Sequence, residues 1–240
     1  MIKIGHRGAC GHKPENTLSS FAKAIELGAD MVECDVYLSR DDVPVVIHEP
    51  IVDKTTDGHG RVADLTVAEL KRLKIKPNET IPTLQEVIDL IKGRCRLNAE
   101  MKDIRAAEKI AELLTKNKMI DASLITSNNR PALVRARKIN PRLKIGWVFW
   151  TAGTDFRQFF FRIFCYLIYP YIRRHIITGM KDLDGDILSI DHYLLSSGFI
   201  RKLKKENISI YAWVVNRPAI IRKMKEGGVA GIISNYPDRL

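Results

Sequence analysis

The spacing of apolar side chains changes along the first forty residues. A short apolar run at residues 1–4 predicts a strand. Apolar residues then recur at helical spacing over residues 18–29, with Gly28 near the end of the run, and this spacing predicts a helix. Residues 31–38 alternate as a half-buried strand does. The chain is therefore expected to begin with a strand–helix–strand unit.

A regular alternation of strands and helices is expected from residue 96 onward. Such alternation is typical of parallel strands that are joined by right-handed crossovers. With the two earlier strands, the pattern gives eight strands in 240 residues, which predicts an α/β fold of the closed (β/α)8 TIM barrel type; a doubly wound open sheet is the alternative. The later strands are expected at residues 96–101, 124–126, 143–149, 187–190, 209–215 and 231–234.

Two stretches interrupt this alternation. After the second strand, a turn at Asp41-Asp42 and an apolar run at 43–47 predict a hairpin, and irregular sequence follows, so we expect an insertion over about 43–80. A long apolar crossover is expected over about 150–182. No linker rich in Pro, Gly or Ser divides the chain, so residues 1–240 are expected to form a single domain.

The crossover contains an apolar, aromatic run from Phe159 to Tyr169, followed by Arg173-Arg174. The run is too short to span a bilayer, which needs about 20 mainly apolar residues. One interpretation is a crossover helix that is buried on one side. The other is an amphipathic element that makes peripheral contact with a membrane near the mouth of the barrel.

Charge is unevenly distributed along the chain. The net charge is +11, yet residues 1–50 carry five Lys/Arg and eight Asp/Glu. An acidic region inside a basic protein suits a bound metal cation whose substrate is an anion. The sequence has neither a lysine-rich run nor an interleaved aromatic ladder, so we expect no nucleic-acid partner.

The cysteines are single and widely separated. They lack the close pairs of zinc sites, so we interpret them as reduced structural thiols, at positions Cys10, Cys34, Cys95 and Cys165. The polar stretch at residues 5–16 leaves no room for the apolar core of a signal peptide. We therefore expect a cytoplasmic protein, with peripheral contact at the inner membrane face as a further option.

Acidic residues occupy the ends of two predicted barrel strands, where the working residues of such barrels lie. Glu33 and Asp35 are two residues apart, so both side chains point to the same face of the strand, and Glu100 ends the next barrel strand. Mg²⁺ and Ca²⁺ prefer oxygen ligands of this kind. The pattern predicts one divalent cation; a pair of solvent-facing carboxylates on an edge strand is the alternative.

Histidines and cations end other predicted strands. His6 and His48 form a candidate acid–base pair, because one group must take a proton and another must give one at a phosphodiester. Each could instead be a structural histidine. His12 and His59 lie on glycine-flanked loops and do not end strands, so we rank them lower.

Arg7 and Lys102 are the candidate phosphate-binding cations, since both stand at strand ends beside the residues above. A solvated surface charge for Arg7 and a structural ion pair for Lys102 are the alternatives. Trp213 ends a later strand and faces the same end of the predicted barrel.

Together, these residues resemble the glycerophosphodiester phosphodiesterase family. The resemblance covers nearly the whole chain and rests on His6-Arg7-Gly8, Pro14-Glu15-Asn16-Thr17, Glu33-Cys34-Asp35-Val36, Val46-Ile47-His48, Pro82-Thr83-Leu84, Glu100-Met101-Lys102, Ala212-Trp213-Val214-Val215-Asn216 and Tyr236-Pro237-Asp238.

The resemblance implies metal-dependent hydrolysis of a small-molecule glycerophosphodiester to sn-glycerol 3-phosphate and an alcohol. It implies that His6 and His48 are the acid–base pair and that Glu33, Asp35 and Glu100 hold the divalent ion. Arg7 and Lys102 would bind the phosphate, and Trp213 would line the glycerol or leaving-group side.

The sequence departs from the family pattern at a few positions. Glu49 stands where an aspartate commonly follows the second histidine, Ser127-Asn128 replaces a usual Ser-Phe, and Asn235 is at a position that takes Asp or Asn. These changes bear on the shape of the pocket more than on the chemistry. A lysophospholipase D that acts on membrane lysolipids, and a non-catalytic membrane-surface barrel, are the alternative functions.

Overall fold

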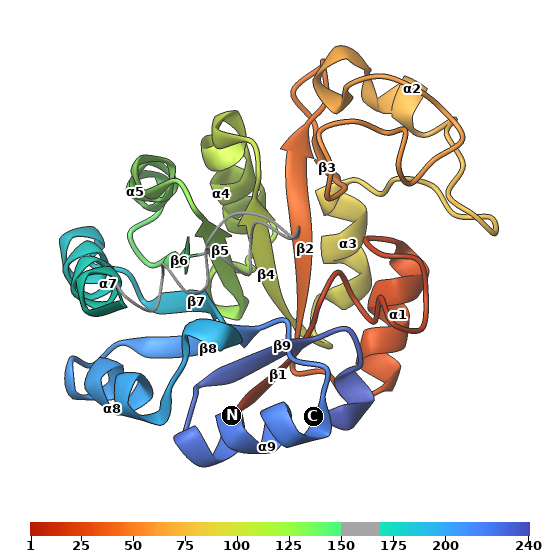
Figure 1. Cartoon of the computed structure of the whole chain (residues 1–240). Coiled ribbons are helices and arrows are strands. Elements are labelled where there is room, and N and C mark those ends of the chain that lie inside the picture. The colour runs from red at the N-terminus through yellow and green to blue at the C-terminus, as the bar shows by residue number, and fades with distance from the viewer. Residues whose placement is uncertain (150–168) are drawn as a thin grey trace.

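The computed structural model describes residues 1–149 and 169–240, which form a closed parallel barrel (Figure 1). The barrel closes because β1 pairs in parallel with both β9 and β2. The predicted (β/α)8 TIM barrel is confirmed, and the open-sheet alternative is wrong. The eight barrel strands are β1 (Ile2–Gly5), β2 (Met31–Leu38), β4 (Arg96–Met101), β5 (Ser123–Ser127), β6 (Lys144–Phe149), β7 (Ile187–Asp191), β8 (Ser209–Trp213) and β9 (Gly231–Ser234).

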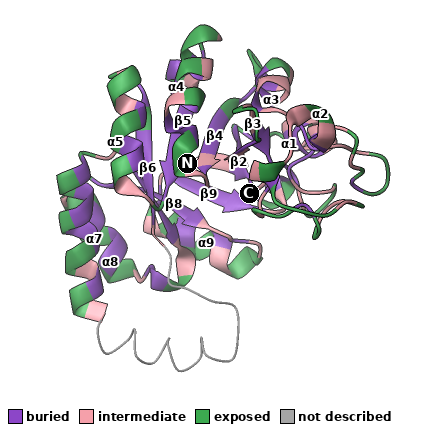
Figure 2. Cartoon of the chain, turned by 90° about the horizontal axis from the view of Figure 1, so that it is seen from above, coloured by how far each residue is buried: buried purple, intermediate pink, exposed green. Residues whose placement is uncertain are grey.

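Helices surround the strands, and Figure 2 shows that their inward faces are buried while their outer faces are exposed. Several begin at a side-chain cap that satisfies a free backbone N–H. The Thr17 hydroxyl accepts from the backbone N–H of Ser20, and Thr83 forms a capping box with Glu86. The helices outside the barrel are α1 (Leu18–Glu26), α3 (Leu84–Ile91), α4 (Ala107–Lys116), α5 (Arg130–Ile139), α7 (Tyr169–Leu183), α8 (Ser197–Lys205) and α9 (Pro218–Gly227).

The strand period divides β2 into two chemically different faces. Val32, Cys34 and Val36 belong to the apolar core between strands and helices, as the alternation predicts. Met31 joins a separate apolar cluster with inward-facing residues of other strands. The next two positions on the face of Met31 are Glu33 and Asp35, so the polar chemistry lies toward the C-terminal ends of the strands.

The predicted hairpin is present after β2. Strand β3 (Pro44–Val46) pairs antiparallel with β2, with Val46 opposite Val36. The insertion that follows contains the short helix α2 (Val67–Leu70) and lies at the upper right of Figure 1. It has a small apolar core of its own, formed by Val45, Ile47, Val52, Val62, Leu70, Ile75 and Ile81.

The apolar run from Phe159 to Tyr169 lies outside the described residues, apart from Tyr169, which is the first residue of α7. Cys165 lies outside them too, and the other three cysteines are free thiols. Within residues 1–149 and 169–240, no helix combines the length and the apolar character needed to cross a membrane.

The turn after β1 requires glycine at its second position. Arg7 has φ 48° and Gly8 has φ 82°, so both are left-handed. A Cβ added to Gly8 would lie 2.5 Å from Ser20 Oγ and 2.6 Å from the Ser20 backbone carbon. Close contact between this turn and α1 therefore holds Arg7 in place.

We expect Gly8→Ala to lower the free energy of unfolding by about 3 kcal/mol or more, because it adds a backbone clash to the strain of a positive φ. Gly28→Ala is the matched control, since Gly28 has φ 77° with open space around its Cβ position, and should cost only about 1–2 kcal/mol. Urea unfolding followed by circular dichroism measures both, and equal losses would contradict the close-packing argument.

Candidate active site

The predicted site residues line one cavity at the C-terminal ends of the barrel strands. Its volume is about 540 Å³. The sequence thus identified strand ends that the fold brings together from distant parts of the chain. The predicted residues on its wall are His6, Arg7, Glu33, Asp35, His48, Glu100, Lys102 and Trp213, and Tyr37, Glu49, Asn128, Val148, Ser189, Val214 and Ile233 complete the lining.

Three carboxylates converge on one side of this cavity. Asp35 on β2 stands opposite Glu100 on β4 in the strand register, and Glu33 precedes Asp35 on the same face. One oxygen from each lies within 4.8 Å of the others. Glu33 is only 2% exposed, and its Oε1 has no hydrogen-bond partner among the described residues. A buried carboxylate oxygen without a partner, next to two more carboxylates, fits a divalent cation.

The carboxylates do not share one electrostatic environment. Burial raises the pKa of Glu33 well above its usual value, and the negative charges of Asp35 and Glu100 raise it further. Burial also raises the pKa of Glu100, and it outweighs the attraction of Lys102. Removing these carboxylates from water is therefore unfavourable until a cation approaches.

The pKa of Asp35 is shifted in the opposite direction, because its carboxylate contacts two cations. Its Oδ1 lies 3.2 Å from Lys102 Nζ, and its Oδ2 lies 3.3 Å from Arg7 Nε. Burial alone would raise the pKa of Asp35, but Lys102 and Arg7 together hold it below its usual value. Lys102 Nζ also forms an ion pair with Glu100, so it bridges two of the three carboxylates.

Arg7 is held in place through both its backbone and its side chain. Its N–H donates to Glu33 Oε2 at 2.8 Å, and its Nη1 donates to Glu15 Oε2 at 2.8 Å. Burial acts to lower the pKa of Arg7, but Asp35 and Glu15 raise it. The guanidinium is thus charged and oriented at the cavity wall rather than solvated at the surface.

Asn16 supports the same group of residues from the loop before α1. Its side chain donates from Nδ2 to Asp35 Oδ2 at 2.9 Å and accepts from the Asp35 backbone N–H at 3.3 Å. Its own backbone N–H donates to the Arg7 carbonyl at 3.1 Å, with φ 58°. Glu15 and Asn16 were not among the site residues predicted from the sequence, and the Pro14-Glu15-Asn16-Thr17 motif was their only signal there.

His6 projects into the cavity from the end of β1. Its Nδ1 lies 2.7 Å from Asn235 Oδ1 and 3.7 Å from Cys10 Sγ. Asn235 is itself held, because its backbone N–H donates to Asn216 Oδ1 at 2.9 Å. Burial and the neighbouring Arg7 charge lower the pKa of His6 to about 4. The imidazole is therefore neutral at pH 7.

His48 reaches the cavity from the insertion. The backbone N–H of the preceding Ile47 donates to the Asp35 carbonyl at 3.0 Å, which ties the chain before His48 to β2. His48 Nδ1 lies 3.3 Å from Glu49 Oε1, and Lys54 Nζ contacts the same oxygen at 2.9 Å. Glu49 therefore holds the His48 ring on the side of the insertion.

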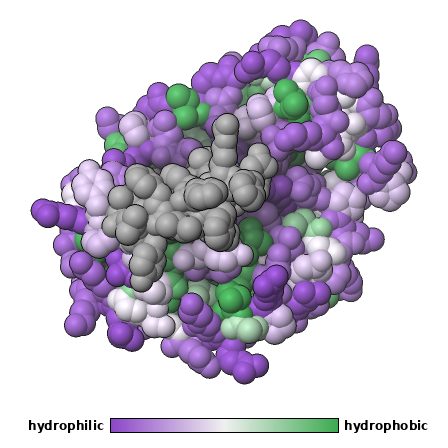
Figure 3. All heavy atoms as spheres, in the orientation of Figure 1, coloured by the Kyte–Doolittle hydropathy of each residue, from purple (hydrophilic) through white to green (hydrophobic). Residues whose placement is uncertain are grey.

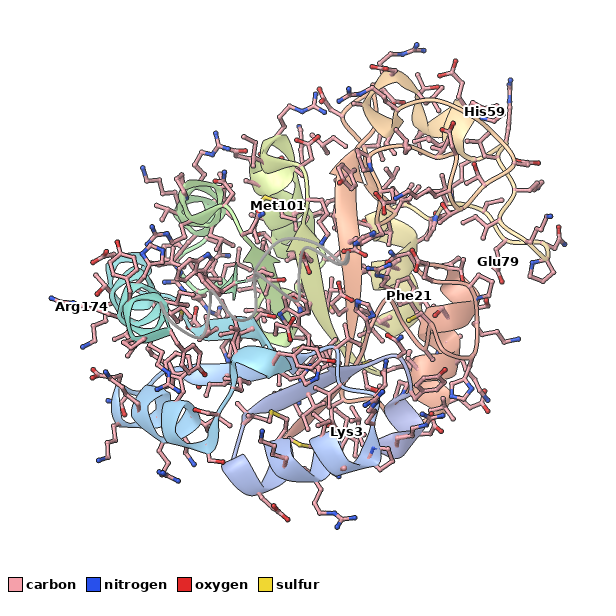
Figure 4. All side chains as sticks on the ribbon, viewed as in Figure 1. Lys3, Phe21, His59, Glu79, Met101 and Arg174 are labelled. Carbon is pink, nitrogen blue, oxygen red and sulfur yellow. The ribbon has the colours of Figure 1, made fainter. Side chains whose placement is uncertain are left out.

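The two lower-ranked histidines lie away from the cavity. His12 Nε2 lies 2.7 Å from Asp238 Oδ1, and its ring packs edge-on against Tyr236. The side chain of His59 is 88% exposed and contacts Asp53, and Figure 4 shows it at the outer edge of the insertion. Neither ring lines the cavity.

Trp213 and the positions that depart from the family pattern complete the wall. Trp213 Nε1 is buried and has no hydrogen-bond partner among the described residues, so it is a donor available to a ligand. Glu49 and Asn128 line the cavity, whereas the Ser127 hydroxyl donates to the Met101 carbonyl at 2.9 Å. Of these departures, Glu49 and Asn128 therefore change the surface that a substrate meets.

Comparison with known proteins identifies relatives of the whole chain. The model of the glycerophosphoryl diester phosphodiesterase family matches residues 6–149 and 177–239. A glycerophosphodiester phosphodiesterase of Caldanaerobacter subterraneus is 32% identical, and the match covers 100% of this chain and 96% of that protein. A putative glycerophosphodiester phosphodiesterase of Bacillus subtilis is 30% identical over 99% of this chain and 96% of its own.

Solved structures show the same likeness. A phosphodiesterase of Oleispira antarctica, in complex with the product sn-glycerol-3-phosphate, is 28% identical with a TM-score of 0.82, over 98% of this chain and 93% of that one. The glycerophosphodiester phosphodiesterase of Thermotoga maritima is 26% identical with a TM-score of 0.79, over 99% and 96% of the two chains. The chain belongs to the glycerophosphoryl diester phosphodiesterase family, whose members are phosphoric diester hydrolases.

Proposed function

We propose that this protein hydrolyses glycerophosphodiesters to sn-glycerol 3-phosphate and an alcohol, with one bound Mg²⁺ or Ca²⁺. The observation that carries the proposal is the single cavity that joins three carboxylates, two histidines and two cations. The product bound to the Oleispira antarctica relative supports the substrate class. A non-catalytic barrel would not need this full set of groups.

Glu33, Asp35 and Glu100 would hold the ion, since their oxygens are close enough to share it. A bound divalent ion would withdraw charge from the phosphate oxygens and so favour the transition state. Arg7 and Lys102 stand beside the same carboxylates and would bind the remaining phosphate oxygens. The substrate phosphate would therefore lie above β2, between the ends of β1 and β4.

The two histidines have different hydrogen-bond and ion-pair partners, and we assign their roles from this difference. His6 is the proposed base: it is neutral at pH 7, and because Asn235 Oδ1 is an acceptor, the ring proton is held at Nδ1 and Nε2 is left with its lone pair. His48 is the proposed acid, because it reaches the same cavity from the insertion, where its Nδ1 is held by Glu49. As the nucleophile attacks phosphorus, His6 takes its proton and His48 protonates the leaving oxygen while the P–O bond breaks.

We expect purified wild-type protein to release glycerol 3-phosphate from a glycerophosphodiester and to lose this activity when a chelator removes divalent ions. His6→Ala and His48→Ala should each lower kcat by roughly a hundredfold to ten-thousandfold, because each removes one proton transfer. His59→Ala is the matched control and should retain wild-type turnover. Near wild-type kcat in either site variant would contradict the assignment of that histidine.

Glu33→Gln should raise the melting temperature of the metal-free protein, because it removes a buried charge. The folded-state pKa of Glu33 lies above its unfolded value, so ionisation of this group destabilises the fold increasingly as pH rises through that range. The gain should therefore be larger at pH 8 than at pH 4. A thermal shift series with and without chelator measures it.

The same variant tests the cation site. Saturating Mg²⁺ or Ca²⁺, at about 100 times Kd, should stabilise the wild type by about 2.7 kcal/mol, and Glu33→Gln should lose most of this effect. Glu79→Gln, at the outer edge of the insertion in Figure 4, is the control and should respond as the wild type does. An equal response of wild type and Glu33→Gln to the ion would place the metal elsewhere.

Asn235→Ala should lower kcat by about 10–100-fold with little change in KM, because His6 would no longer be held in one tautomer. Asn235→Asp should move the acid limb of the kcat/KM profile to higher pH, since a carboxylate beside His6 raises the pKa of the base. Asn78→Asp, in an exposed turn, serves as the control. An unchanged acid limb in Asn235→Asp would show that His6 is not the base.

A further inference from the structure

A second hollow, of about 670 Å³, adjoins the active-site cavity on the side of the insertion. One wall comes from the insertion and includes Pro50, Arg61 and Asp64, and the other comes from the turn after β4. Tyr37 and Lys102 line both this groove and the active-site cavity. The two hollows therefore adjoin each other at these two side chains. We call the second hollow the insertion groove.

The insertion groove lies on the side of the proposed acid. His48 protonates the leaving oxygen under the proposed mechanism, and Pro50, two residues later, forms part of the groove wall. Trp213 lies at the end of β8, which is on the opposite side of the barrel from β4 in the strand order. A diester bound at the phosphate position thus has one arm toward Trp213 and the other toward the insertion groove.

The charges in the groove are not all neutralised within the protein. Arg105 forms an ion pair with Asp103 at 2.6 Å, so these two groups neutralise each other. In contrast, the side chains of Arg61 and Asp64 have no hydrogen-bond or ion-pair partner among the described residues, although both line the groove. They sit on one short turn, η1 (Val62–Asp64) and the residue before it. The groove thus offers one free cation and one free anion.

The groove has both polar and apolar surface, and few of its apolar side chains are large. Ile104, 46% exposed, is its one large exposed aliphatic side chain among the described residues, and the Tyr37 hydroxyl has no partner there. Figure 3 shows that hydrophilic residues predominate over the insertion, at the upper right. An acyl chain would gain little by leaving water for such a surface.

We infer that the insertion groove binds the leaving alcohol of the diester and selects an alcohol that carries both an ammonium and a carboxylate group, as a seryl head group does. This inference rests on the proposed function. Asp64 would bind the ammonium and Arg61 the carboxylate, while the phosphate stays at Arg7 and Lys102. The glycerol arm would then occupy the Trp213 side of the active-site cavity.

The test compares kcat/KM for three diesters that share the glycerophosphate arm: glycerophosphoserine, glycerophosphoethanolamine and glycerophosphoglycerol. The wild type should prefer the serine diester. Arg61→Gln should lower its kcat/KM by roughly two- to fivefold and leave the ethanolamine diester unchanged, because exposed ion pairs are weak. Asp64→Asn should lower kcat/KM for both ammonium-bearing diesters by a similar factor. Neither substitution should affect the glycerol diester.

Controls and a steric variant complete the experiment. Arg94→Gln and Asp182→Asn remove exposed charges far from the groove and should leave all three values unchanged. Ala63→Phe fills the groove, so it should slow all three diesters but spare glycerophosphomethanol, whose leaving alcohol is too small to enter. Equal wild-type activity on the three diesters, unaltered by the Arg61 and Asp64 substitutions, would overturn the inference and leave the proposed function intact. No hydrolysis of any diester would overturn the proposed function itself.

Discussion

Asp35 is the group on which the arrangement of the site depends, because its side chain and its backbone each bind other segments. Its carboxylate contacts Arg7 in the turn after β1 and Lys102 just after β4, and it accepts from Asn16 in the loop before α1. Its carbonyl accepts from Ile47, which precedes His48. One buried residue thus fixes the positions of both proposed phosphate-binding cations and of the proposed acid. Such a centre is stable only because its charge is paired on both sides.

The site combines the paired carboxylate of Asp35 with two carboxylates whose ionised forms are disfavoured by burial. Glu33 and Glu100 have raised pKa values because burial disfavours their charged forms, while Asp35 remains ionised beside its cations. A divalent ion bound by all three would recover part of the solvation that Glu33 loses in the fold. The same burial that weakens the metal-free fold would therefore strengthen the attraction for the proposed ion. Stability and metal affinity would then oppose each other at this position.

The sequence predicted the barrel and the wall of its cavity for a physical reason. Alternation along residues 31–38 has a fixed period, so it determines which side chains share a face, and parallel strands bring their C-terminal ends to one mouth. The side-chain contacts between segments far apart in the sequence do not follow from this periodicity. The contact between His6 and Asn235 joins residues 229 positions apart, and the loop conformation that aims Asn16 at Asp35 requires a left-handed backbone. No local pattern encodes either contact, so only the folded chain reveals which nitrogen of His6, the proposed base, faces Asn235.

The insertion links the chemistry to the choice of substrate. It supplies His48 to the cavity and, within the next sixteen residues, Pro50, Arg61 and Asp64 to the groove. Because the group that protonates a leaving oxygen must lie beside it, the alcohol has to depart on the side of the protein from which that proton comes. Under the proposed mechanism, the barrel would determine how the phosphate is held, and the insertion would determine which alcohol can be released. Changes in the insertion would then alter selectivity while the carboxylates and His6, which belong to the barrel strands and their ends, remain in place.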